Sequence, residues 1–253
     1  MMAMEKIYFT NSHKKKLCGM ISDSKTEMKA NMAVLMCHGL GSHKNDMPYK
    51  ALQKEVGALG IATLSLDLLG HGESDGEYDD LTLTETIDDI LCAKHELERR
   101  GYKNIGFIGS SFGGVGGIMA AAVEQFKFLV LISPPTYYDI NEMITSGVYI
   151  LRELLKVNKQ TKTTEKKKAS LNIKFFRDYG SHDSYAAGEK IRAPVLIIQG
   201  DKDKIVPIAK SRELRRRIRG AKMKIFVGAD HQYTRVQHQL VEETMKFVEK
   251  QKS

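Results

Sequence analysis

The alternation of short apolar runs with longer segments of helical period restricts the fold of this chain more than any other feature of its sequence. The apolar runs are rich in Val, Ile and Leu and cover residues 32–37, 61–66, 105–108, 128–132, 195–198 and 223–227. Segments of helical period lie at 48–59, 83–100, 114–123, 209–219 and 237–251. This order predicts an α/β fold, with a mostly parallel sheet flanked by helices. Such sheets bind ligands at the carboxyl ends of their strands.

Length and composition are those of an ordinary globular protein. The chain has 253 residues, of which 42% are apolar and 28% charged, so disorder and a collagen-like repeat are poor interpretations. Cys18, Cys37 and Cys92 are widely spaced and form no CxxC pair, which argues against a disulfide framework and a zinc site. We find no signal-peptide pattern and no run of 18 apolar residues. We therefore expect a cytoplasmic protein with no membrane partner.

One interval interrupts the alternation. Between residues 133 and 193 the chain has about sixty residues without a convincing strand, too many for a simple crossover loop. We expect a core of residues 1–133 and 192–253 and a cap or lid insertion over residues 134–191. Apolar residues at helical spacing between 140 and 155 fit either a helix packed on the core or a lid.

A glycine-framed serine follows the third apolar run. Residues 109–113 read Gly-Ser-Ser-Phe-Gly and lead into a segment rich in small residues, which is the G-x-S-x-G pattern in strand, turn and helix context. A nucleophile on so sharp a turn needs glycine two residues before and after it, because a Cβ at either place would collide with its neighbours. This frame selects Ser111 over Ser110. A phosphate-binding loop is less well supported, since neither G-K-[ST] nor G-x-G-x-x-G fits the segment.

A serine nucleophile needs a base, and the base needs an orienting carboxylate. In the order nucleophile, acid, histidine, the best base is His231, which lies in the loop after the last strand. The preceding strand is followed by Asp201 and Asp203. Asp201 can close the turn, and Asp203 lies farther along the loop toward the histidine, so we predict Asp203 as the acid.

The tetrahedral intermediate of acyl transfer requires two backbone N–H donors. We expect one from Phe112, the residue after the nucleophile, and the other from Leu40, in the loop after the first parallel strand. His38 precedes the nucleophile, and we expect it to hold this loop by hydrogen bonding.

Together these residues resemble the α/β-hydrolase superfamily over nearly the whole chain. The resemblance rests on the Gly-x-Ser-x-Gly segment and on residues 38–41 (HGLG), 67–74 (DLLGHGES) and 200–207 (GDKDKIVP). In the family's version of the last motif the second aspartate is catalytic, which supports Asp203. Where the family often has histidine before the nucleophile, this chain has Ser110.

The DxxGHGxSDG stretch and the compact insertion look most like cinnamoyl and feruloyl esterases and monoacylglycerol-lipase-like hydrolases. In those enzymes the insertion forms a small cap over the acyl pocket. The resemblance also implies that His71 has a structural role.

The residues and the resemblance together predict a serine carboxylic-ester hydrolase that forms an acyl-enzyme and needs no metal or organic cofactor. Thioesterase, monoacylglycerol lipase or peptidase-like activity remains open, as does a ligand-binding module on the same fold. A homodimer is possible. Six aromatic or apolar residues could line the acyl pocket or pack the cap on the body, namely Tyr137, Tyr138, Met143, Ile144, Phe175 and Phe176.

The net charge of +8 is regional. Residues 150–224 hold 21 Lys plus Arg and 8 Asp plus Glu, a net of +13, and the rest of the chain has a net of −5. This distribution gives no reason to expect a nucleic-acid partner. The basic segment fits solvated helix faces, or a basic rim that draws a small anionic ester to the pocket.

Overall fold

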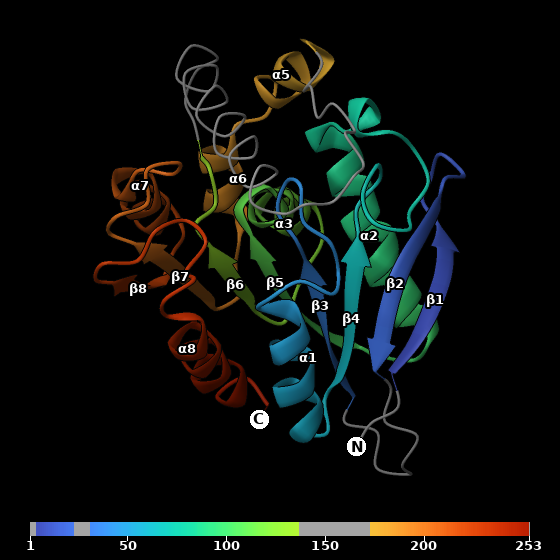
Figure 1. Ribbon diagram of the computed structural model, residues 1–253, viewed down its shortest axis with the longest axis horizontal. Helices are drawn as coiled ribbons and strands as arrows, with labels where there is room; N and C mark the ends of the chain where they lie inside the picture. The colour runs from blue at the N-terminus through green and yellow to red at the C-terminus, as the bar shows by residue number, and fades with distance from the viewer. Residues whose placement is uncertain (1–3, 23–30, 137–172, 253) are drawn as a thin grey trace.

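The computed structural model describes residues 4–22, 31–136 and 173–252, and these form a single eight-stranded sheet with helices on both faces (Figure 1). The strand order is β1-β2-β4-β3-β5-β6-β7-β8. The strands are β1 (Met4–Thr10), β2 (Lys16–Ser22), β3 (Met32–Cys37), β4 (Ala62–Asp67), β5 (Asn104–Ser110), β6 (Leu129–Ile132), β7 (Val195–Gly200) and β8 (Lys222–Phe226). The helices are α1 (Tyr49–Ala58), α2 (Leu83–Arg99), α3 (Ser111–Val123), α5 (Ile173–Tyr179), α6 (Ser184–Lys190), α7 (Ile208–Arg217) and α8 (Gln237–Glu249), with a short 3₁₀ turn, η1 (Tyr78–Asp80).

The expected mostly parallel sheet is confirmed. All six apolar runs form strands, β3 to β8, and each neighbouring pair among them is parallel. The five expected helices correspond to α1, α2, α3, α7 and α8, with ends that differ by up to a few residues. Strands β1 and β2 were not predicted. They pair antiparallel with each other, and β2 is also antiparallel to β4.

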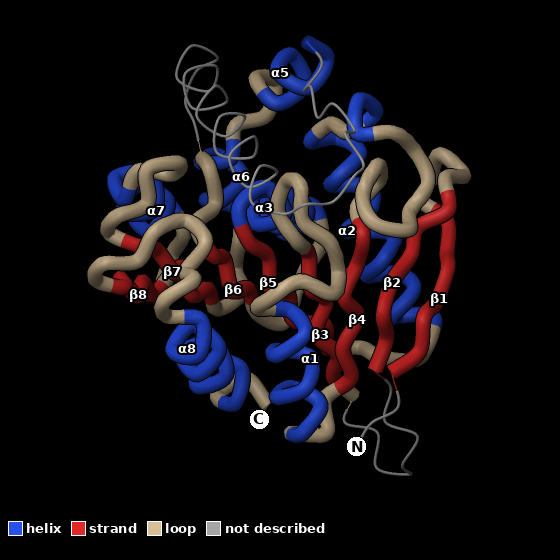
Figure 2. The backbone as a smooth tube through the Cα atoms, viewed as in Figure 1, coloured by secondary structure: helices blue, strands red, loops and turns tan. Residues whose placement is uncertain are grey.

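Apolar side chains alternate between two cores, one on each face of the sheet. On β3, Val34 and Met36 point to the face covered by α1 and α8, whereas Leu35 and Cys37 point to the other face. Helices α2, α3, α6 and α7 cover that second face (Figures 1 and 2). Because both faces are covered, the central strands read as continuous apolar runs.

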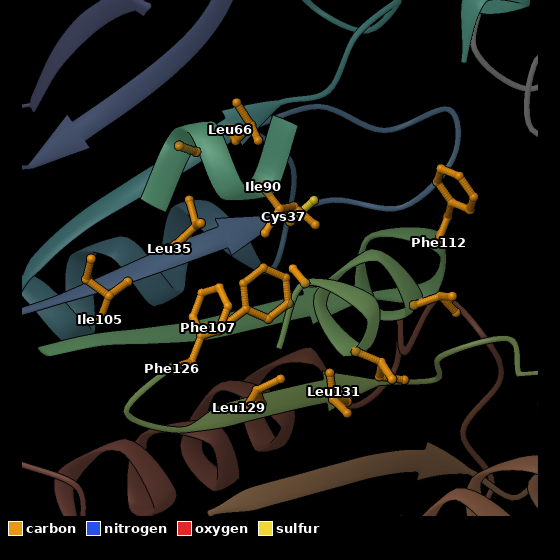
Figure 3. Packing of buried hydrophobic residues seen from close by; sticks show 14 of the residues in the cluster. Leu35, Cys37, Leu66, Ile90, Ile105, Phe107, Phe112, Phe126, Leu129 and Leu131 are labelled. Atoms are coloured by element: carbon orange, nitrogen blue, oxygen red, sulfur yellow. The ribbon is translucent and has the colours of Figure 1, made fainter. Parts of the chain in front are cut away.

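The packing between β5 and α3 is dense. Figure 3 shows Phe107 and Phe126 close together in this core, and their ring centroids are 5.7 Å apart in an edge-on arrangement. A Cβ at Gly117 would lie 2.0 Å from the Phe107 ring, so the helix can approach the strand this closely with glycine there. This close packing sets the position of α3 relative to the end of β5.

Helices α5 and α6 belong by sequence to the expected insertion, yet their buried side chains join the core on the α3 face. Phe175, Tyr179 and Tyr185 are buried in that cluster, and the Phe112 and Phe175 ring centroids are 5.3 Å apart. The rest of the insertion, residues 137–172, lies outside the described residues. Among the helices described, none is both long and apolar enough to cross a membrane.

The loop after β3 is anchored by a buried ion pair. The Lys44 side chain is 2% exposed, and its Nζ lies 2.5 Å from Oδ2 of fully buried Asp67 and 2.9 Å from Oε1 of Glu73. The Lys44 backbone N–H also donates to Asp67 Oδ1 at 2.7 Å. Burial by itself lowers the pKa of Lys44, but the hydrogen bonds to the two carboxylates reverse this, and the pKa is raised overall.

Two neutral histidines also hold this loop by hydrogen bonds: His38, as expected, and His71, for which a structural role was expected. Leu68 N–H donates to His38 Nε2 at 3.1 Å, and Nδ1 of the same ring bonds Gly39 O at 2.8 Å. Gly41 N–H donates to His71 Nε2 at 3.1 Å. Burial, and next the closeness of the His71 ring, lower the pKa of His38 to about 3, so the ring remains a backbone acceptor at ordinary pH.

This depressed pKa predicts a pH-dependent contribution to stability. The unfolded chain binds a proton at His38 below about pH 6.5, whereas the folded chain does not until about pH 3. The contribution of neutral His38 to the free energy of unfolding is therefore complete above about pH 6.5 and is lost progressively as the pH falls toward 3. We expect His38→Gln to lower the free energy of unfolding by about 1 to 3 kcal/mol at pH 7 and the gap to wild type to narrow by pH 4.

Urea unfolding followed by circular dichroism at pH 7, 5 and 4 measures this gap. His43→Gln, in an exposed histidine of the same loop, is the control and should leave the free energy of unfolding nearly unchanged. A His38→Gln gap of constant size from pH 7 to pH 4 would contradict the expectation.

Candidate active site

The candidate nucleophile Ser111 is the first residue of α3 and follows β5 without an intervening loop. Its φ is +48°, in the left-handed region that a residue with a side chain rarely adopts. This sharp turn lifts the hydroxyl above the carboxyl edge of the sheet. Ser133 and Tyr233, which line the same cavity, also have positive φ values of 45° and 53°. Such strain persists where the surrounding packing enforces it.

The structure confirms the steric reason for the glycine frame. A Cβ at Gly113 would lie 2.3 Å from the carbonyl oxygen of His38, in the loop after β3. A Cβ at Gly109 would lie 2.6 Å from the Phe107 ring and 2.8 Å from Gly113 O. Strand, helix and loop therefore meet around Ser111 at distances that larger residues would forbid.

The structure brings the three predicted triad residues together. The loop after β8 places His231 Nε2 3.0 Å from Ser111 Oγ, and the loop after β7 places Asp203 Oδ2 2.8 Å from His231 Nδ1. With Nδ1–H donating to the carboxylate, Nε2 is left to accept the serine proton; this tautomer follows from the hydrogen-bond partners. The His231 side chain is 12% exposed and that of Asp203 is fully buried.

The buried Asp203 carboxylate is held by several donors. Its Oδ1 accepts the backbone N–H groups of Ile205 and Val206, and its Oδ2 accepts Gln199 Nε2 at 3.0 Å. Burial by itself raises the pKa of Asp203, but the hydrogen bond and charge of His231 and the backbone donors outweigh it, so the pKa lies below its ordinary value. Asp201 instead accepts Gly228 N–H at 2.6 Å, and this bond joins the loop after β7 to the loop after β8.

The two predicted oxyanion donors belong to segments that adjoin the nucleophile. Phe112 is in the first turn of α3, where backbone N–H groups have no partner within the helix. Leu40 follows Gly39, and a Cβ at Gly39 would lie 3.0 Å from Ser111 Cβ, so this loop runs directly past the nucleophile. The loop after β3 and the first turn of α3 therefore adjoin each other at Ser111, as a pair of oxyanion donors requires.

One buried tyrosine, which the sequence analysis did not identify, links the two halves of this site. Tyr49 is 1% exposed, and its hydroxyl donates to Cys37 O at 3.0 Å, at the end of β3 where the Leu40 loop begins. The same hydroxyl oxygen forms a short hydrogen bond with Ser110 Oγ, immediately before the nucleophile. Since the tyrosine proton is directed to Cys37 O, Ser110 is the donor of this second bond.

The triad opens into a cavity of about 400 Å³. One part of its lining is apolar, formed by Leu40, Met47, Pro48, Ile132, Ile205 and Leu240. Four predicted pocket residues, Tyr137, Tyr138, Met143 and Ile144, lie outside the described residues. Of the other two, Phe175 is 4% exposed and packs on Phe112 and Tyr179, and Phe176 packs on the same core. Neither is among the described residues that line the cavity, so their position favours packing of the insertion on the body.

Comparisons with known proteins fit this architecture. Two curated relatives from Escherichia coli, both named as an uncharacterized 31.7 kDa protein in the traX-finO intergenic region, are 26% and 25% identical over 138 residues. Each match covers 53% of this chain and 48% of the relative, so the chain spans about half the length of the curated relatives it matches.

Several solved structures share the fold over almost the whole chain. Est1E from Butyrivibrio proteoclasticus with ferulic acid bound has a TM-score of 0.79 at 23% identity, covering 97% of this chain and 98% of that chain. The α/β hydrolase GrgF from Penicillium sp. sh18 has a TM-score of 0.81 at 16% identity, with coverages of 98% and 99%. The Pyrococcus furiosus esterase Pf2001 has a TM-score of 0.77 at 18% identity, with coverages of 100% and 92%.

The family comparison agrees with the topology and with the resemblance seen in the sequence motifs. The model of the alpha/beta hydrolase family matches residues 34–244, which include strands β3 to β8 as well as Ser111, Asp203 and His231. On this match and the architecture, the chain belongs to the alpha/beta hydrolase family and has its fold.

Proposed function

We propose that this chain is a serine hydrolase that cleaves carboxylic esters through an acyl-enzyme intermediate. The observation that carries the proposal is the continuous hydrogen-bonded array from Ser111 Oγ through His231 to Asp203, at 3.0 and 2.8 Å. A serine hydroxyl is a weak nucleophile at neutral pH and becomes effective when a positioned imidazole removes its proton as it attacks. The family and its esterase neighbours support the same assignment.

In the proposed reaction, Ser111 Oγ attacks the ester carbonyl while His231 Nε2 takes its proton. His231 then returns the proton to the departing alcohol oxygen, leaving the acyl group on Ser111. Asp203 keeps the imidazole in the tautomer that can accept at Nε2 and stabilises its charged form. The N–H groups of Leu40 and Phe112 bind the oxyanion, and water activated by His231 releases the acid.

We propose small apolar or aromatic acyl groups, of the hydroxycinnamoyl kind, as the substrates of this site. The apolar side of the cavity formed by Leu40, Ile132 and Leu240 supports this class. Its volume of about 400 Å³ is within the range of small-ligand sites. The structural neighbour Est1E, which is described with ferulic acid bound, points the same way.

Replacement of the nucleophile tests the proposal. We expect Ser111→Ala to reduce kcat for p-nitrophenyl butyrate by a factor of about 10⁴ or more, because no acyl-enzyme can form. Ser181→Ala, at an exposed serine away from the cavity, is the matched control and should retain wild-type turnover. Hydrolysis by Ser111→Ala at the wild-type rate would contradict the assignment. Saturable binding of the ester without turnover by the wild type would favour a ligand-binding module.

The tyrosine link predicts a second kinetic effect. Tyr49→Phe removes the hydroxyl that joins Cys37 O to Ser110 Oγ, so the Leu40 loop and the nucleophile turn lose a shared anchor. Because oxyanion contacts strengthen as the oxyanion forms, we expect kcat for p-nitrophenyl butyrate to fall about tenfold with little change in KM.

Ser110→Ala is the comparison variant for this effect. It leaves the Tyr49 to Cys37 hydrogen bond in place, and its loss of kcat should be smaller than that of Tyr49→Phe. Unchanged kcat in Tyr49→Phe, or a rise in KM alone, would show that the hydroxyl does not position the oxyanion donors.

A further inference from the structure

Two lysines lie on the cavity beside the candidate triad. Lys202 and Lys204 flank Asp203 in the loop after β7, and both line the cavity that contains Ser111 and His231. Both lysines are exposed at its rim. In the described part of the chain, neither ammonium group makes an ion pair or hydrogen bond with another residue. Their charges are therefore available to a molecule in the cavity.

The acidic groups of this region do not neutralise them. The Asp203 carboxylate bonds His231, Gln199 and two backbone N–H groups. Asp201 accepts Gly228 N–H. Asp230 is exposed and lines the cavity, and its Oδ1 accepts Gln232 N–H at 3.2 Å. Among the described residues that line the cavity, Asp230 is therefore the only acidic one, against two lysines.

Lys202 and Lys204 differ from the other described Lys and Arg residues of the basic segment, residues 150–224, because they line the cavity. Helix α7 has three consecutive arginines, but Arg216 and Arg217 pair with Glu213, and none of the three lines the cavity. Among the described residues from 173 to 224, Lys202 and Lys204 are the only Lys or Arg residues on the cavity wall. Within residues 173–224, the described part of the basic segment, the positive charge therefore reaches the candidate site through the Asp203 loop.

We propose that the preferred substrate is an ester with a second, anionic group, a carboxylate or a phosphate-like group, that Lys202 and Lys204 bind. The proposal rests on the proposed ester hydrolysis and specifies its substrate class. The apolar wall accommodates the body of the substrate, and the two ammonium groups recognise its charged end. Because both lysines are solvent-exposed, their contribution is partly screened, and we expect a preference of about fivefold to tenfold rather than an absolute requirement.

Substrates that differ in charge but hardly in shape test this preference. Mono-p-nitrophenyl adipate carries a terminal carboxylate, and p-nitrophenyl adipamate carries the neutral amide in its place. The phosphonate analogue, p-nitrophenyl 5-phosphonopentanoate, distinguishes a carboxylate site from a phosphate site. We expect kcat/KM for the better anion to exceed that for the amide about fivefold or more at low salt, with the preference falling at 0.5 M NaCl as the charges are screened.

Variants assign the preference to the two lysines. In the double variant Lys202→Gln and Lys204→Gln, the ratio of kcat/KM for the anionic ester to that for the amide should fall to about one. Lys222→Gln, at an exposed lysine on β8 that does not line the cavity, should leave the wild-type ratio unchanged. A ratio near one in the wild type, or an unchanged ratio in the double variant, would overturn the proposal.

A binding measurement separates this proposal from the proposed catalysis. Ser111→Ala, titrated by calorimetry with monomethyl adipate and with methyl adipamate, should bind the anion about fivefold or more tightly, and the two lysine substitutions should abolish the difference. Ester turnover without tighter anion binding would contradict the lysine site while leaving the hydrolase assignment intact. Tighter anion binding in a protein that hydrolyses no ester would support the site and contradict the hydrolase assignment.

Discussion

The site depends on the close crossing of β5 and α3. Ser111 occupies this crossing with a φ of +48°, and helix, strand and the loop after β3 pack tightly enough around it to hold this conformation. The carbonyl oxygens of Cys37 and His38 lie where a Cβ of Gly113 would fall, so the loop that supplies Leu40 packs directly on the helix that supplies Phe112. A single packing constraint therefore sets both the nucleophile and its two candidate oxyanion donors.

Buried polar groups hold the loops that this packing brings together. Lys44 and Asp67 pair at 2.5 Å beneath the Leu40 loop, and His38 accepts a backbone N–H from Leu68 because its lowered pKa keeps it neutral. On the other side, Gln199 and backbone N–H groups hold the Asp203 carboxylate, and Ser211 Oγ donates to Gln199 Oε1 at 2.6 Å. Such groups are costly to bury unless each is satisfied, which favours one arrangement of the loops over others.

The sequence predicted the parallel part of the sheet because strands buried on both faces are continuous apolar runs. It did not predict β1, in which Ile7 is the only buried residue and has an exposed residue on each side. It also missed the turn after β1, which the Asn11 side chain holds by accepting the His13 and Lys15 N–H groups. The triad residues could be selected, although Ser111 and His231 are 120 residues apart, because the glycine frame and the loops after predicted strands mark them in the sequence. Tyr49 could not, since it lies in no such motif and only the fold brings it to Cys37 and Ser110. For Phe175, residue type indicates burial but does not specify which cavity or core receives the ring.

The central claim is that Ser111 carries the acyl group during turnover. Intact-protein mass spectrometry after rapid mixing with p-nitrophenyl acetate and acid quench measures this directly. The account predicts an adduct with the mass of one acetyl group, formed in step with a burst of p-nitrophenol, mapping to the peptide that contains Ser111 and absent from Ser111→Ala. Two results would contradict it. One is steady hydrolysis by the wild type with the adduct on another residue. The other is hydrolysis and an adduct that both persist in Ser111→Ala.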